Sequence, residues 1–205
     1  GILVDIQGPK LRLIDGIDAT GDQVTLRHRG HDDIAGFDVG FDPHAIGVRA
    51  GERILINDGR IELVALEVGP HYVRASVRQG GTAQGRRGVN LPDTDVRVEM
   101  YNDKDRADIA AAVAAGADWI ALSFVQRPED VLEARALVPP NVRLLAKIER
   151  PQALSVLDEI CAVSDAVMAA RGDLGVEIDF ARLPLVQRNI AGAALRSGIA
   201  SICAT

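Results

Sequence analysis

Two patterns of hydrophobic and polar positions follow one another along the chain. From residue 103 onward, short and nearly continuous apolar segments alternate with segments of helical periodicity. The apolar segments begin near Asp118, Val142, Asp165 and Ile199. Continuously apolar strands separated by helices are typical of a parallel sheet covered on both faces. We therefore predict an α/β fold here, and this pattern fits either a barrel or a doubly wound sheet.

Local signals mark where the helices of this part begin and end. Pro128 and Pro151 each precede a helical pattern and are well placed as first helical residues. Asn102 with Asp105 resembles a helix cap, and Gly116 suits the position just after a helix. No Gly-x-Gly-x-x-Gly motif follows the first strand, which disfavours a dinucleotide-binding fold.

Residues 14–98 have a different pattern, in which apolar and polar residues alternate over short segments. The segments read QVTLRH, RILIN, RIELVALEV and HYVRASVRQG. Asn57-Asp58-Gly59 separates two of them and predicts a β-hairpin. We expect 14–98 to form an inserted all-β domain, and 1–13 with 99–205 to form the α/β domain. Such an insertion suggests a lid over the carboxyl-end mouth of the parallel sheet.

Composition excludes several classes of function. The net charge is −6 and the basic residues are scattered, so no positive stripe indicates a nucleic-acid partner. No apolar run reaches the roughly 20 residues of a membrane span. Cys161 and Cys203 lie in apolar segments, which suits a reducing compartment, and we expect the cytoplasm. The chain begins and ends within strand-like segments, so we expect a fragment of a longer protein.

Charged residues gather where two predicted strands end. Strand alternation puts Lys147 and Glu149 on one face, where they either pair as a buried ion pair or bind a ligand. Asp173 can meet Glu149 from a neighbouring strand, and two carboxylates suit Mg²⁺. If a short helix begins here, the N–H groups of Gly172 and Asp173 can face a carboxylate or phosphate. Arg171-Gly172-Asp173 therefore fits an active-site corner, with a plain surface turn as the alternative, and a reducing compartment disfavours an exposed adhesion tripeptide.

Other polar residues carry weaker signals. Ser123 closes a strand on the same rim, and Thr205 ends the last strand, where most threonines are structural. Arg86 and Arg87 lie beside glycines, where they either reach phosphates or form a solvated basic turn. The histidines have no metal-ligand spacing, and we interpret them as solvated surface. They are His28, His31, His44 and His71.

Six motifs in register resemble those of the pyruvate kinase family. In chain order they are DIQGPKLR, GVNLP, ALSFV, AKIER, MAARGDLGVE and ICAT. The resemblance spans essentially the whole chain. It implies part of a (β/α)8 TIM barrel, about strands 3–7, with a small β-barrel domain inserted after the third strand.

The resemblance also implies an activity, the phosphoryl transfer from phosphoenolpyruvate to ADP that gives pyruvate and ATP. Lys147 would neutralise the transferring phosphoryl group and the forming enolate. Glu149 and Asp173 would hold Mg²⁺, with Mn²⁺ as an alternative. Gly172, Asp173 and Thr205 would bind the substrate carboxylate, and Thr205 also matches the start of the relay to the enolate. Arg171 would orient this corner by pairing with a carboxylate.

Further roles follow from the same resemblance. The residues matched to nucleotide binding are Arg12, Asp58 and Arg87. The residues matched to the monovalent-cation pocket are Asp5, Ile6, Lys10 and Ser123. Ile6-Gln7 and Lys10 follow the pattern of members that do not require K⁺, because a tethered ammonium can replace the ion. Arg87 stands where the family usually has Lys, and these two side chains are not equivalent donors.

The chain lacks parts that the family pattern contains. The upstream substrate-binding residues, the final barrel strand and the C-terminal domain do not match any segment. We therefore expect this 205-residue chain to be inactive by itself, and the full-length family to form tetramers. Two alternatives stay open: a Mg²⁺-dependent aldolase that acts through a pyruvate enolate, and a non-catalytic remnant. The aldolase gives no reason for the β domain or for Arg86-Arg87.

Overall fold

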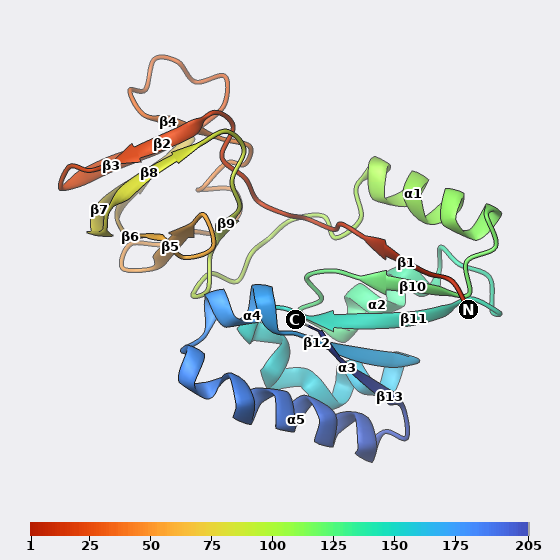
Figure 1. Cartoon of the computed structure of the whole chain (residues 1–205). Coiled ribbons are helices and arrows are strands. Elements are labelled where there is room, and N and C mark those ends of the chain that lie inside the picture. The colour runs from red at the N-terminus through yellow and green to blue at the C-terminus, as the bar shows by residue number, and fades with distance from the viewer. Residues whose placement is uncertain (205) are drawn as a thin grey trace. The chain divides into compact units, whose positions relative to one another are not determined.

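The computed structural model describes residues 1–204 and divides the chain into two compact units. One consists of Gly1–Pro9 and Glu99–Thr205, and is called the α/β unit; the other, Lys10–Val98, is called the β unit. Figure 1 shows the elements of each. The β unit begins slightly earlier than the sequence pattern predicts, because two antiparallel bridges join Arg12 and Leu13 to other residues of this unit.

The α/β unit contains a five-stranded parallel sheet in the order β1-β10-β11-β12-β13. Its strands are β1 (Leu3–Ile6), β10 (Trp119–Leu122), β11 (Arg143–Ile148), β12 (Ala166–Ala170) and β13 (Ala200–Ala204). Its helices are α1 (Asp103–Ala114), α2 (Pro128–Arg135), η1 (Pro151–Val156), α3 (Leu157–Val163), α4 (Arg171–Glu177), η2 (Phe180–Arg182) and α5 (Leu183–Arg196). No helix among the described residues is long and apolar enough to cross a membrane.

The two faces of this sheet differ in what covers them. Alternate strand residues such as Ile120 and Leu144 belong to one large core together with Ile109, Val131 and Ile190 of the helices. The helical core residues of the described chain all belong to this cluster, which disfavours the doubly wound alternative, in which helices cover both faces.

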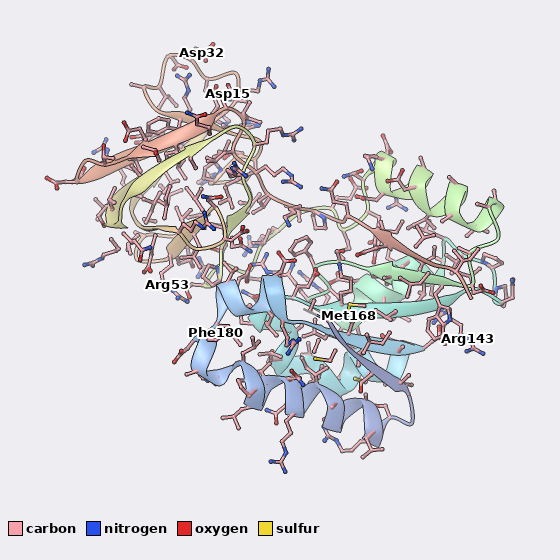
Figure 2. The ribbon with its side chains drawn as sticks, in the orientation of Figure 1. Asp15, Asp32, Arg53, Arg143, Met168 and Phe180 are labelled. Carbon is pink, nitrogen blue, oxygen red and sulfur yellow. The ribbon has the colours of Figure 1, made fainter. Side chains whose placement is uncertain are left out.

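The other face carries a smaller apolar cluster made of strand residues. Ala121, Leu145 and Ala166 are buried there, with Trp119 and Met168 packed against them. Met168 is labelled in Figure 2. An apolar depression of about 270 Å³ lies over this face. Its lining residues are Leu3, Trp119, Leu145, Ala166, Ala200 and Ile202. The face is therefore apolar but only partly covered in this chain.

Local sequence signals fix the ends of the helices as predicted. The Asn102 side chain accepts a hydrogen bond from the backbone N–H of Asp105. The Asp105 side chain accepts one from the backbone N–H of Asn102, and the two bonds form a capping box before α1. Pro128 is the first residue of α2. Gly116 follows α1 with a φ of 83°, a left-handed conformation that glycine adopts without a steric penalty. These three predictions are confirmed.

The β unit consists of a six-stranded sheet in the order β4-β3-β7-β6-β5-β9 and a two-stranded sheet, β2-β8. Its strands are β2 (Gly16–Ala19), β3 (Gln23–His28), β4 (Phe37–Val39), β5 (Arg53–Ile56), β6 (Ile61–Gly69), β7 (Tyr72–Gln79), β8 (Gly81–Gln84) and β9 (Val89–Asn90). A separate core that includes Leu26, Ile56 and Leu63 holds them together. The predicted hairpin is confirmed: β5 and β6 pair antiparallel, and Asn57 and Asp58 between them have positive φ.

Candidate active site

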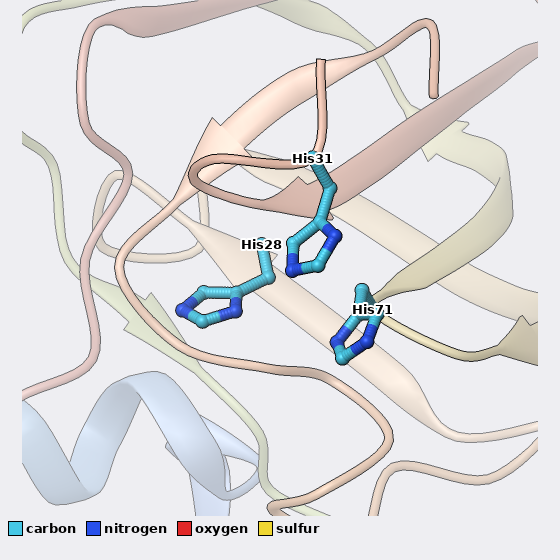
Figure 3. Close-up of side chains that lie close together, drawn as sticks. All are labelled: His28, His31 and His71. Atoms are coloured by element: carbon cyan, nitrogen blue, oxygen red, sulfur yellow. The ribbon is translucent and has the colours of Figure 1, made fainter. Parts of the chain in front are cut away.

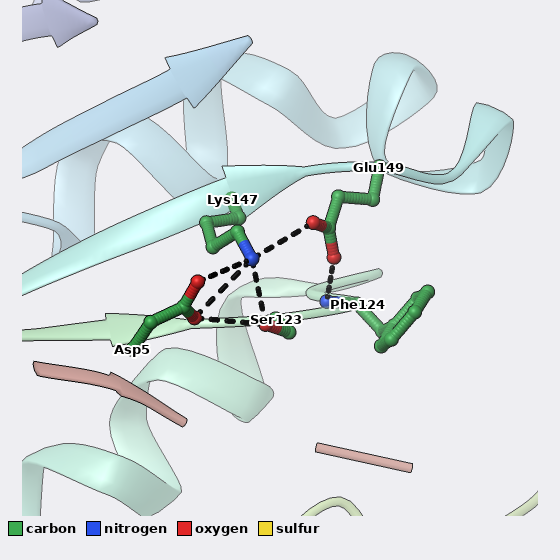
Figure 4. Close-up of polar contacts among 5 residues, drawn as sticks. All are labelled: Asp5, Ser123, Phe124, Lys147 and Glu149. Carbon is green, nitrogen blue, oxygen red and sulfur yellow. Dashed lines mark hydrogen bonds and ion pairs between the residues drawn. The ribbon is translucent and has the colours of Figure 1, made fainter. Parts of the chain in front are cut away.

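Lys147 lies at the centre of a polar cluster where three neighbouring strands end (Figure 4). Its Nζ lies 2.9 Å from Asp5 Oδ2 in β1, 2.9 Å from Ser123 Oγ just after β10, and 3.0 Å from Glu149 Oε1 just after β11. Ser123 Oγ also donates to Asp5 Oδ1 at 3.1 Å. We call these four residues the Lys147 cluster.

The parallel topology of the sheet brings the Lys147 cluster together. The carboxyl ends of parallel strands meet at one edge, so residues far apart in sequence become neighbours. Strand alternation places Lys147 on the same face as Leu145, which is buried in the small apolar cluster. The four-carbon stem of Lys147 therefore belongs to a largely apolar face while its ammonium group reaches the polar rim.

Burial differs sharply among the charges of the cluster. The side chain of Glu149 is 1% exposed, that of Lys147 13%, and that of Asp5 55%. Burial acts to lower the pKa of Lys147, but the charge of Glu149 and the hydrogen bond to Asp5 outweigh it, so this pKa is raised. The ammonium therefore stays protonated. Burial raises the pKa of Glu149, and the nearby Lys147 charge opposes this rise.

Phe124 gives the cluster a strained corner that the sequence pattern does not indicate. Its φ is 60°, a conformation that costs a bulky residue on the order of 1–3 kcal/mol. In this conformation its backbone N–H donates to Glu149 Oε2 at 2.8 Å. The contact fixes the second oxygen of the carboxylate whose first oxygen pairs with Lys147. Nothing in the sequence signals it, because aromatic residues rarely adopt positive φ.

Glu149 and Asp173 are two carboxylates whose charges act on each other. Asp173 lies in the first turn of α4, and its charge contributes to the raised pKa of Glu149, so the two groups act on each other. Each carboxylate oxygen can accept more than one contact, so the bonds of Glu149 to Lys147 and Phe124 leave capacity for a metal. Carboxylate oxygens are donors of the kind that Mg²⁺ takes in proteins.

Arg171 has a different partner from the one predicted. Among the described residues its Nε donates to the backbone carbonyl oxygen of Ala204 at 2.7 Å, and no carboxylate pairs with it there. Because β12 and β13 are neighbours, this bond joins the start of α4 to the end of β13. Gly172 and Asp173 lie in the first turn of α4, whose N–H groups are outside the internal ladder of a helix. Thr205 lies outside the described residues.

In the β unit, the residues matched to nucleotide binding gather around Gly88. Arg12 forms an antiparallel bridge with Gly88, next to Arg87. The carbonyl oxygen of Gly88 accepts from the N–H of Asn57 at 3.1 Å, next to Asp58 in the hairpin. Three segments distant in the sequence therefore meet here.

Lys10 belongs to the same region of the β unit. A Cβ added at Gly88 would lie 3.7 Å from Lys10 Cε. The other residues matched to the monovalent-cation pocket belong to the α/β unit, where Asp5 and Ser123 join the Lys147 cluster and Ile6 is buried in the large core. The structure therefore brings Asp5 and Ser123 together within the α/β unit, whereas Lys10 belongs to the β unit.

The fold and the Lys147 cluster define an α/β protein with a charged site at the carboxyl ends of a parallel sheet. The family model for the pyruvate kinase barrel domain matches residues 1–205. A pyruvate kinase of Methylorubrum extorquens is 45% identical over all of this chain and 44% of its own length. One from Agrobacterium vitis is 41% identical over 93% of this chain and 42% of its own length.

A solved structure agrees with these relatives. A pyruvate kinase from Cryptosporidium parvum has a TM-score of 0.91 and 29% sequence identity, and the match covers all of this chain and 45% of that protein. The chain belongs to the pyruvate kinase family. It spans less than half the length of these relatives.

Proposed function

We propose that this chain is the part of a pyruvate kinase that binds phosphoenolpyruvate and carries the phosphoryl-transfer site. The complete enzyme transfers the phosphoryl group to ADP and yields pyruvate and ATP, the last step of glycolysis. The observation that carries the proposal is the Lys147 ammonium, which Asp5, Ser123 and Glu149 hold at the ends of three parallel strands. Membership of the pyruvate kinase family indicates which reaction to expect, and the Lys147 cluster provides a positive charge that this reaction needs.

Lys147 neutralises negative charge as it moves between the phosphoryl group and the enolate. Phosphoryl transfer depends mainly on positioning and on charge stabilisation. A cation held in place before substrate binds needs little rearrangement during the reaction, and this is the condition for strong electrostatic catalysis. Asp5, Ser123 and Glu149 provide that fixed position in the proposal.

Glu149 and Asp173 hold Mg²⁺, with Mn²⁺ as an alternative. When bound, the metal neutralises the carboxylate and phosphate oxygens of the substrate. The N–H groups of Gly172 and Asp173 and the hydroxyl of Thr205 bind the substrate carboxylate. Arg171 positions the start of α4 through its bond to Ala204, which makes it a positioning residue.

The β unit binds the phosphates of ADP in this proposal. Arg12 and Arg87 supply positive charge around Gly88, and Asp58 lies in the neighbouring hairpin. The Arg87 Nε donates to the carbonyl of Gln84 at 3.1 Å, which leaves the rest of its guanidinium group for a phosphate. Arg87 is the departure from the family pattern, and a guanidinium group can bind a phosphate through two parallel bonds.

The finer architecture belongs to the same proposal. The five parallel strands, with helices on one face and a partly covered apolar opposite face, support about strands 3–7 of a (β/α)8 barrel whose interior is that apolar face. The β unit is the inserted domain. The full-length enzyme is cytoplasmic and tetrameric, and acts on neither nucleic acid nor membranes.

The reaction is tested in a full-length form of the enzyme that contains this segment. ADP-dependent formation of pyruvate from phosphoenolpyruvate, coupled to lactate dehydrogenase, supports the proposal. Retro-aldol release of pyruvate from a hydroxy-oxo acid, without ADP dependence, favours the aldolase instead. The 205-residue chain should show no ADP phosphorylation in the same assay, because its open sheet edges lack their neighbours.

We further propose that Lys10 replaces K⁺. The initial rate in a tetramethylammonium buffer should be the same with and without KCl, and Lys10→Glu should make the rate depend on K⁺. Lys10→Arg, which keeps the charge, is the matched control and should stay independent of K⁺. Strong activation of the unmodified enzyme by K⁺ would contradict the role of Lys10.

A further inference from the structure

Three histidines of the β unit form a cluster that the sequence spacing did not indicate (Figure 3). His28 ends β3, His31 lies in the loop that follows, and His71 lies in the turn between β6 and β7. One ligand atom from each lies within 4.8 Å of the others. All three are half-buried. The interpretation of these side chains as separate, solvated surface residues is therefore wrong, whereas His44 is exposed as expected.

The backbone holds the three histidines together. The N–H of His28 donates to the carbonyl oxygen of His71 at 2.7 Å, and that of His31 donates to the carbonyl oxygen of His28 at 3.3 Å. The rings of His31 and His71 stack with centroids 3.8 Å apart and planes 10° apart. The His28 ring centroid lies 5.6 Å from that of His31. The cluster is thus built into the pairing of β3 with β7.

Asp42 orients one of the imidazoles. His71 Nδ1 lies 2.5 Å from Asp42 Oδ2, and the other oxygen of Asp42 accepts from the N–H groups of His44 and Ala45. A carboxylate on one ring nitrogen fixes the tautomer and leaves Nε2 of His71 as a ligand atom. Histidines that bind metals commonly have such a carboxylate partner.

One further feature needs an explanation that hydrogen bonding within the chain does not give. His28 Nδ1 is buried, and among the described residues it has no hydrogen-bond partner. A buried polar atom without a partner is unfavourable, because it has lost its hydrogen bond to water. A ligand bound among the three imidazoles would give a reason for this unpartnered nitrogen.

We propose that His28, His31 and His71 form a binding site for a transition-metal ion, with Zn²⁺ as its ligand. Imidazole nitrogen suits Zn²⁺, whereas Mg²⁺ prefers oxygen ligands, so this site is chemically distinct from the Glu149–Asp173 pair. Three protein ligands leave one tetrahedral position for water. Zn–N bonds of about 2.0–2.1 Å require ligand nitrogens roughly 3.3 Å apart, so the rings close in from their present separation by side-chain rotation.

The site would act on the stability of the β unit. It joins the end of β3, the loop after it and the turn between β6 and β7, and these segments are held in place here by few core residues. A ligand that binds only the folded state stabilises it by mass action. Zn²⁺ should therefore raise the melting temperature and slow hydrogen exchange in these three segments.

Isothermal titration calorimetry with ZnCl₂ tests the proposal on the whole chain. The titration uses the Cys203→Ser background, because Cys203 is exposed, and excess MgCl₂, which occupies the carboxylate pair. We expect one Zn²⁺ bound per chain. His31→Gln and His71→Gln should each weaken binding at least tenfold, and Asp42→Asn about 10–100-fold. His44→Gln is the matched control and should bind as the background does.

Co²⁺ provides a second measurement that does not depend on the stability of any variant. Co²⁺ bound by three imidazoles and water should show the visible absorption bands typical of four-coordinate Co²⁺. Added Zn²⁺ should displace the Co²⁺ and remove these bands. Retained binding in both His31→Gln and His71→Gln, equal losses in His44→Gln, or no Zn²⁺ binding to the unmodified histidine cluster would each overturn the proposal. Circular dichroism of each variant establishes that it is folded before it is titrated.

Discussion

The two units of this chain assemble their polar groups in different ways. In the α/β unit, Asp5, Ser123 and Lys147 meet because parallel strands end at one edge. In the β unit, the three histidines and the residues around Gly88 meet because turns and loops fold onto neighbouring strands. Alternation along a strand is readable in a sequence, whereas the meeting of two loops depends on the whole sheet. The comparison explains why the Lys147–Glu149 pair was predictable and the histidine cluster was not.

The largest stability effects should come from the two separate cores. Ile120→Ala in the α/β unit and Leu63→Ala in the β unit each remove a fully buried side chain, and each should cost about 2–5 kcal/mol. Because the two core clusters share no residue among those described, each variant should speed hydrogen exchange mainly in its own unit. Exchange measured by mass spectrometry checks this. Equal acceleration of exchange in both units would show that they unfold together, and would contradict the view that each unit has a separate core.

Loss of the helix cap should have a smaller effect. Asn102→Ala removes the side-chain oxygen that accepts from the N–H of Asp105, and should destabilise the α/β unit by about 1 kcal/mol. Asn102→Asp keeps an accepting oxygen and is the matched control. Urea denaturation followed by circular dichroism measures both. A full-size loss in Asn102→Asp would mean that the cap does not act through this hydrogen bond.

A fall in pH should change the contributions of two carboxylates to stability in opposite directions, one carboxylate in each unit. Hydrogen bonds from Arg53 lower the pKa of Asp93 in the β unit below its ordinary value of 3.8, so its contribution to stability is present above that value and is lost as the pH falls through the lowered pKa. Burial raises the pKa of Asp130 in the α/β unit. Its ionised form therefore costs stability, and this cost disappears as the pH falls through the raised pKa.

Two variants separate these pH effects. Asp93→Asn should reduce the loss of stability that the β unit shows as the pH falls. Asp130→Asn should remove the gain of stability that the α/β unit shows as the pH falls. The free energy of unfolding, measured between about pH 7 and pH 2 with probes in each unit, gives the result. If Asp130→Asn left the pH dependence of the α/β unit unchanged, the assigned role of its burial would be wrong.

The sequence predicted what short-range physics decides. The cap at Asn102, the proline at the start of α2 and the hairpin at Asn57-Asp58 each depend on residues within a few positions. Lys147 and Glu149 share a side because strand alternation is local. The contacts of Lys147 with Asp5 and Ser123 were not predicted, since no local pattern identifies the neighbour of a strand; family resemblance only assigned Asp5 and Ser123 to a common pocket.

Other contacts escaped prediction for identifiable physical reasons. Phe124 adopts a positive φ that its residue type does not favour. Arg171 reaches the carbonyl of Ala204 because β12 and β13 are adjacent, and a backbone acceptor leaves no trace in the sequence. The helices cover one face of the sheet, and continuously apolar strands alone left a barrel and a doubly wound sheet undecided. Each miss concerns a partner supplied by tertiary structure.

Kinetics of Lys147→Met in a full-length form of the enzyme tests the central claim most directly. The claim is that the Lys147 ammonium, held by Asp5, Ser123 and Glu149, stabilises charge in the transition state. The variant should reduce kcat by about 10³-fold or more, while phosphoenolpyruvate binding measured with Mg²⁺ changes only severalfold. Lys10→Met, made in parallel with KCl present, should keep most of its turnover. Near-normal kcat in Lys147→Met would contradict the account.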